Sequence, residues 1–238
     1  MAWKHGVTYP VDELKTIEMK ALKAILKVKT TMTTNDLILH ELQRCSIIAK
    51  IKDRQYLFYK KLSDIPLGEA VVRNVIQMCE DSIVISYYSQ LKGGNATNDI
   101  SEREKRIMES TASMCIYYHN FNFSGKSCIY SSFLNDYHRY IISRWRLSNH
   151  DLKIETGRYT KPCTPREERL CNFCNSIEDE YHVIFVCPLY AIIRHNYLDL
   201  VESNSIYMFL DPAFNQMKRT AAFLHEIELF RKSSNLSM

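Results

Sequence analysis

Apolar residues recur at helical spacing along almost the whole chain. Between Val11 and Val28 they fall at every third or fourth position, which is the pattern of a helix that buries one face. Pro10 and Asp12 are typical of the start of such a helix. The same periodicity predicts further helices, over 47–62, 68–88, 129–147 and onward from Pro212. Because strand patterns are scarce, with 82–86 the best of them, the chain is expected to be mainly α-helical.

The clearest break in this pattern is the run Lys92-Gly93-Gly94-Asn95, since consecutive glycines interrupt a helix. Ser101 and Glu104 then have the spacing of a capping box, which predicts that a new helix opens at Ser101. We therefore expect two helical lobes, residues 1–92 and 99–238.

Composition narrows the class of protein. Of 238 residues, 46% are hydrophobic and 24% charged, which is ordinary for a folded globular chain. No stretch reaches the roughly 20 apolar residues of a membrane span, and residues 1–10 lack the apolar core of a secretion signal. An intracellular protein without a membrane partner is expected. The eight cysteines are then expected to be reduced thiols or metal ligands.

Four residues have the spacing of a metal site. Cys171, Cys174, His182 and Cys187 form the pattern C-x2-C-x7-H-x4-C, in which two close thiolates can hold one side of a tetrahedral Zn²⁺ and a His–Cys pair the other. Since all four positions are filled by protein, the predicted zinc is structural. The predicted zinc-binding element covers about 163–195. Cys163 is expected to be a bystander, and the alternative is a set of unrelated buried thiols with a surface histidine.

Catalytic motifs are absent from the sequence. Ser124-Gly125-Lys126-Ser127 resembles the end of a phosphate-binding loop, but the glycine that the motif requires earlier falls on Asn120. No adjacent pair of aspartates of the kind that holds two metal ions in a polymerase is present. No catalytic residue is therefore assigned to this chain.

A basic stretch with aromatic residues leads into the zinc-binding element. Residues 144–169 hold seven Arg or Lys against four acidic residues, although the whole chain has a net charge of only +4. Arginine neutralises phosphates and aromatic rings stack on unpaired bases. The alternative is that Trp145 is a core residue and that the arginines solvate a loop.

The segments 147–158, 169–174, 177–182 and 187–190 resemble the C-terminal region of non-LTR (LINE-type) retrotransposon reverse transcriptases. That region follows the polymerase domain and carries a Cys-Cys-His-Cys zinc-binding element, with an acidic pair before the histidine. A weaker similarity, over 22–28, 34–36 and 41–44, is to the thumb and connecting helices of the family. Gln43 and Ser46 stand where the family usually has Gly and Pro.

The resemblance implies a non-catalytic fragment or decayed copy of an RNA-directed DNA polymerase, since the fingers, palm and endonuclease are missing. Such a fragment would bind template RNA or target DNA and would associate with the remainder of a reverse transcriptase. Phosphate contacts are expected from Arg144, Arg146, Arg158 and Arg169, and base stacking from Phe173 or Tyr181. The alternatives are a zinc-stapled protein-interaction module without nucleic-acid affinity, or a relic without function.

Overall fold

The computed structural model describes residues 11–28, 34–63, 70, 74, 93–109, 135–213 and 215–234. Its α-helices are α1 (Val11–Leu26), α2 (Asn35–Glu41), α3 (Ile47–Ser63), α6 (Asn95–Glu109), α8 (Asp136–Arg146), α9 (Lys153–Thr156), α10 (Ala191–His195), α11 (Leu198–Val201), α12 (Ile206–Leu210) and α13 (Met217–Ser233). Three shorter helical turns are η1 (Arg166–Glu168), η2 (His182–Val186) and η3 (Pro188–Tyr190).

The fold is mainly helical, as the sequence predicted. Within the described ranges no strand forms, and one isolated antiparallel bridge joins Leu170 to Ile177. The expected strand at 82–86 and most of the expected helix at 68–88 lie outside the described residues.

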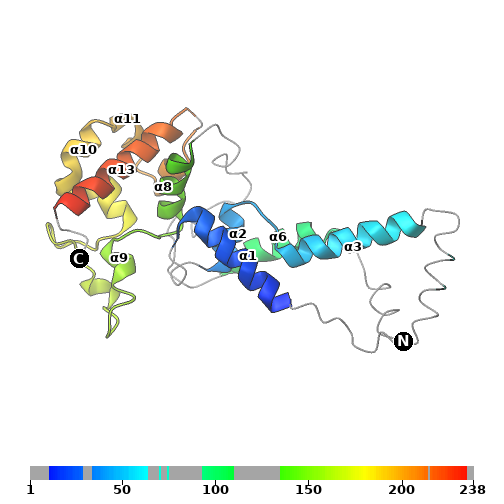
Figure 1. Ribbon diagram of the computed structural model, residues 1–238. Coiled ribbons are helices and arrows are strands. Elements are labelled where there is room, and N and C mark those ends of the chain that lie inside the picture. The colour runs from blue at the N-terminus through cyan, green and yellow to red at the C-terminus, as the bar shows by residue number, and fades with distance from the viewer. Residues whose placement is uncertain are drawn as a thin grey trace.

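Helices α1, α2, α3 and α6 pack together on one side of the molecule (Figure 1). Helix α6 begins at Asn95, directly after the two glycines, because the Asp53 carboxylate of α3 accepts the backbone N–H groups of Asn95 (2.8 Å) and Ala96 (2.9 Å). The predicted capping box is therefore wrong, since Ser101 lies inside this helix. Residues 99–109, which we expected in the second lobe, pack against α2 and α3 of the first.

The short turn after α2 bears on the weaker similarity. Gln43, at the place where the family usually has Gly, adopts φ +51°. This is the left-handed region that favours glycine, and the similarity to the family stays a prediction.

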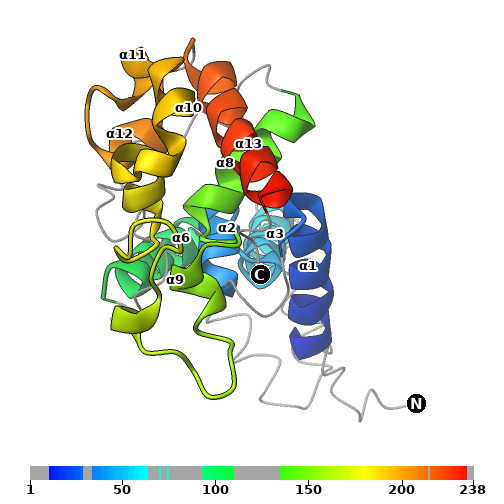
Figure 2. The same cartoon turned by 90° about the vertical axis from the view of Figure 1, so that its left-hand side faces the viewer.

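Helices α8 and α13 pack against each other at the centre of the remaining helices (Figure 2). Trp145 of α8 is 1% exposed and is thus a core residue. Phe209, Phe223 and Ile227 are equally buried. The buried apolar cluster runs without a gap from Leu22 in α1 to these residues, so the two groups of helices share one core. The division into two lobes, residues 1–92 and 99–238, stays a prediction.

Candidate metal centre

A tight turn presents the first two cysteines. The backbone N–H of Cys171 donates to the Ser176 carbonyl (2.7 Å), and that of Asn175 to the Cys171 carbonyl (3.0 Å). Asn175 adopts φ +58°, a conformation that asparagine tolerates better than most residues. The bridge between Leu170 and Ile177 closes the base of the turn. Cys171 and Cys174 are therefore held on one side of a compact knuckle.

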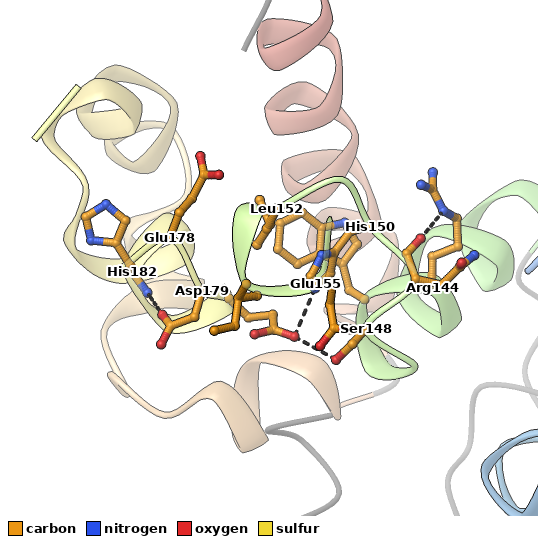
Figure 3. Close-up of polar contacts among 12 residues, drawn as sticks. Arg144, Ser148, His150, Leu152, Glu155, Glu178, Asp179 and His182 are labelled. Atoms are coloured by element: carbon orange, nitrogen blue, oxygen red, sulfur yellow. Dashed lines mark hydrogen bonds and ion pairs between the residues drawn. The ribbon is translucent and has the colours of Figure 1, made fainter. Parts of the chain in front are cut away.

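The other two donors come from η2 and the residue that follows it. Figure 3 shows the Asp179 carboxylate bonded to the backbone N–H of His182 (2.8 Å), which caps the start of this helical turn. The backbone N–H of Cys187 donates to the His182 carbonyl (2.7 Å). These bonds fix His182 and Cys187 relative to each other.

The four side chains meet at one point. The Cys187 sulfur lies 3.8 Å from that of Cys171 and 3.9 Å from that of Cys174, and His182 Nε2 lies 3.2 Å from the Cys174 sulfur. All four donor atoms lie within 4.8 Å of one another. A tetrahedron with metal–sulfur bonds of about 2.3 Å separates its sulfurs by about 3.8 Å. The donor set therefore fits a tetrahedral metal ion, and no position is left open for a reactive water.

Burial and local hydrogen bonds shift the pKa values of three of these donors. Burial raises the pKa of the Cys187 thiol to about 12. Burial would also raise the pKa of Cys174, but hydrogen bonds from the Ser176 backbone, Cys171 and Cys187 outweigh it, so this pKa lies below its usual value. Burial lowers the pKa of His182, which favours the neutral ring that a metal requires. Binding of a cation would thus displace protons from the thiols.

Two further cysteines lie among the described residues, Cys45 and Cys163, and neither belongs to this cluster. Cys163 is exposed, and its sulfur lies 3.7 Å from a guanidinium nitrogen of Arg169. Cys45 is buried. Cys79, Cys115 and Cys128 lie outside the described residues.

Two arginines that the sequence did not single out support the centre. Arg194 of α10 donates to the carbonyl oxygens of Val183 (3.3 Å) and Cys187. Arg231 of α13 pairs with Glu178 (2.6 Å), which lies between the two halves of the ligand set. No sequence signal could have found Arg231, because it is 53 residues from its partner.

Two of the four arginines expected to contact phosphate are buried, and this expectation is corrected for both. Arg146 has no exposed side-chain surface and pairs with Glu41 (3.7 Å) and Asp211 (2.5 Å). Arg169 donates to the carbonyl oxygens of Ile154 (2.7 Å) and Thr164 (2.9 Å). Both guanidinium groups hold distant segments together, so neither reaches a ligand in solvent.

The remaining predicted contacts are at least partly accessible. Arg144 binds both carboxylate oxygens of Glu228 (3.1 Å each), and Arg158 pairs with Glu155 (3.2 Å). The Tyr181 ring packs against Phe185, and its hydroxyl donates to Asn204 (3.0 Å). Phe173, between the two knuckle cysteines, is 60% exposed. Of the predicted nucleic-acid contacts, Phe173 is thus the most open to solvent.

A serine, a histidine and a glutamate also meet beside the centre. Ser148 Oγ (2.8 Å) and His150 Nε2 (2.9 Å) both contact the same oxygen of Glu180, and all three residues are buried (Figure 3). A nucleophilic triad requires the serine to donate to the histidine. Because both side chains instead share the carboxylate, this group is a structural polar network.

In the described part of the chain no helix combines the length and apolar character needed to cross a membrane. The chain matches no family model, no curated protein and no solved structure.

Proposed function

We propose that the Cys171–Cys174–His182–Cys187 cluster binds one structural Zn²⁺. The single observation that carries this proposal is the closed set of three sulfurs and one imidazole around a common point. Such a donor set favours zinc over the oxygen-binding cations Mg²⁺ and Ca²⁺. Held by four protein ligands, the zinc would stabilise the fold and would not activate water.

The chain would act as a non-catalytic, nucleic-acid-binding part of a retrotransposon reverse transcriptase. The residues that resemble that family support this assignment, as does the exposed surface of the knuckle. Phe173 and Tyr159 are exposed (60% and 45%), as are Lys161 and Arg166, which follow Tyr159 by two and seven residues. We call these four residues the knuckle rim. Two cations and two rings suit single-stranded RNA or DNA.

Structure links the two parts of the rim. Arg169 holds the segment that carries Tyr159, Lys161 and Arg166 through its bonds to Thr164 and Ile154. The residues that follow Arg169 form the knuckle that carries Phe173. The side chains of Lys153 and Asn172 also join α9 to this knuckle. The segments that carry the knuckle rim are thus bonded to the chain that leads into the metal ligands.

Fluorescence anisotropy with short RNA and DNA strands at several salt concentrations tests this proposal. Replacing Lys161 and Arg166 together by Ala should flatten the dependence of log K on log salt by about 1.4 units, at 0.7 per phosphate contact. Phe173→Ala should weaken binding by about 1–3 kcal/mol with the slope unchanged. Lys105→Ala and Met108→Ala, both exposed on α6, are the controls. Absence of binding at low salt contradicts the proposal.

The second candidate is a zinc-stapled protein-interaction module. Two exposed apolar side chains near the metal ligands favour it. Val186, which directly precedes Cys187, is 51% exposed, and Ile192, five residues after Cys187, is 82% exposed. This function is favoured over nucleic-acid binding if the full chain binds no nucleic acid at low salt and Ile192→Asp abolishes association with a protein partner.

A further inference from the structure

Arg231 of the C-terminal helix α13 contacts the segments that carry the metal ligands. Arg231 of α13 is buried, with 4% of its side chain exposed. Its guanidinium donates to both Glu178 oxygens (2.6 and 3.4 Å), to the Tyr190 hydroxyl (3.0 Å) and to the Asp151 carbonyl (3.1 Å). Four acceptors on three separate segments thus converge on one planar group, a geometry that arginine provides and lysine does not.

Two of these acceptors flank the metal ligands. Glu178 lies four residues after Cys174 and four before His182, and Tyr190 lies three residues after Cys187. Figure 3 shows the side chains of Glu178 and Asp179 pointing apart, with Asp179 directed to the backbone of His182. The backbone N–H of Glu178 donates to the Arg169 carbonyl (2.9 Å), next to the bridge that closes the knuckle. Arg231 therefore ties the segment before His182 to the segment after Cys187.

The surroundings of this contact keep it rigid. Glu178 is 3% exposed and Tyr190 is fully buried. The Glu178 carboxylate also accepts the backbone N–H of Lys153 (2.9 Å), at the start of α9. Glu178 is thus bound from both α9 and α13, and the Tyr190 ring also packs against Phe230 of α13 (ring centroids 5.9 Å apart). A shift of α13 would therefore be transmitted to both ligand-bearing segments.

We propose that Arg231 is a positioning residue for the metal centre, coupling α13 to metal binding without touching the metal. The inference rests on the proposed zinc site. Residues that support metal ligands from outside the coordination sphere typically contribute 10- to 100-fold to affinity. Coupling of binding free energies is reciprocal, so zinc should in turn protect α13 from opening, although the helix supplies no ligand.

The test uses the full chain and two measurements. Zinc affinity is measured by competition with a chromophoric chelator, and hydrogen exchange is followed over 217–233 with and without zinc. Arg231→Met should weaken zinc binding 10- to 100-fold and abolish the zinc-dependent protection of α13. Arg219→Met is the matched control and should change affinity by less than about twofold. Arg219 lies on the same helix but is 52% exposed, and it contacts Asp199, the Asn196 carbonyl and the Tyr197 ring.

The outcomes separate the two proposals. If the wild-type chain binds no zinc, the metal site itself is wrong and this inference falls with it. If the wild-type chain binds zinc and Arg231→Met binds it equally tightly, only the role of Arg231 is overturned. Should Arg231→Met fail to fold, Arg231→Met with Glu178→Gln removes the unpaired buried charge. The double variant should still show weakened affinity, and wild-type affinity there would also overturn the inference.

Discussion

Replacing Arg146 by Met should destabilise the whole protein. The side chain is fully buried and pairs with Glu41 of α2 and with Asp211 after α12, while its Nε donates to the Leu210 carbonyl (2.7 Å). After the substitution the buried Glu41 carboxylate keeps its bond from Ser143 Oγ (2.8 Å) but loses its ion pair with Arg146 (3.7 Å).

The magnitude follows from burial. Removing one member of a buried ion pair costs about 3–5 kcal/mol, because the other charge remains in a poorly solvated site. Total stabilities are about 5–15 kcal/mol, so the loss is a large part of the whole. Adding Glu41→Gln to Arg146→Met should restore some stability. The double variant should be less destabilised than the sum of the two single variants, by about 1–3 kcal/mol.

Urea unfolding followed by circular dichroism measures these differences. Arg219→Met, which removes an exposed ion pair (2.7 Å), should cost less than about 1 kcal/mol. The reasoning is refuted if Arg146→Met changes stability no more than Arg219→Met does. Weaker RNA binding with unchanged stability would instead place this guanidinium at the nucleic-acid surface, as the sequence alone suggested.

Three further outcomes are expected. Metal analysis of the purified chain should find about one zinc per molecule, lowered by Cys174→Ser, and a chain that retains its zinc after this change would contradict the ligand assignment. Burial, with Arg103 and Arg146 nearby, lowers the pKa of His40 from 6.5 to about 4. Because the unfolded chain then binds a proton more readily than the folded one, the free energy of unfolding falls as the pH drops from 6.5 toward 4. Between pH 7.5 and pH 5 the wild type should therefore lose about 2 kcal/mol more stability than His40→Gln. Gly157→Ala places a Cβ 2.9 Å from both the Lys153 carbonyl and Arg169 Cγ, so thermal unfolding should show a loss of about 1–3 kcal/mol, and an unchanged melting temperature would argue against this packing.

The sequence was most informative where its signal is local. Helical periodicity identified α1 and α3, and four Cys and His residues within 17 positions identified the candidate metal centre, because all of these signals depend on spacing along the chain. The partners of the basic residues could not be predicted in this way. Arg146 meets Asp211, 65 residues away, and a count of charges does not distinguish a cation that faces solvent from one that pairs inside the fold.

The packing of α6 was also out of reach, for a related reason. Helix α6 begins directly after the glycines at 93–94, but these glycines do not indicate which helices α6 contacts. Its return to α2 and α3 depends on Asp53, 42 residues earlier, and on the ion pair between Arg106 and Asp36 (2.9 Å). Boundaries in sequence and boundaries in packing therefore need not coincide.

Arginine side chains in this fold act as cross-links for backbone carbonyl groups. Carbonyl oxygens accept from guanidinium groups at several helix ends and turns, among them those of Arg44, Asn149, Asp151, Ile154 and Leu210. In a β-rich protein such oxygens would be paired within a sheet. Lysine would preserve the positive charge but could not reproduce the planar, several-donor geometry of the guanidinium group. This holds at Arg103, Arg144, Arg146, Arg169 and Arg231. Among homologues, these five positions should therefore accept substitution far more slowly than the exposed lysines of α1 and α3.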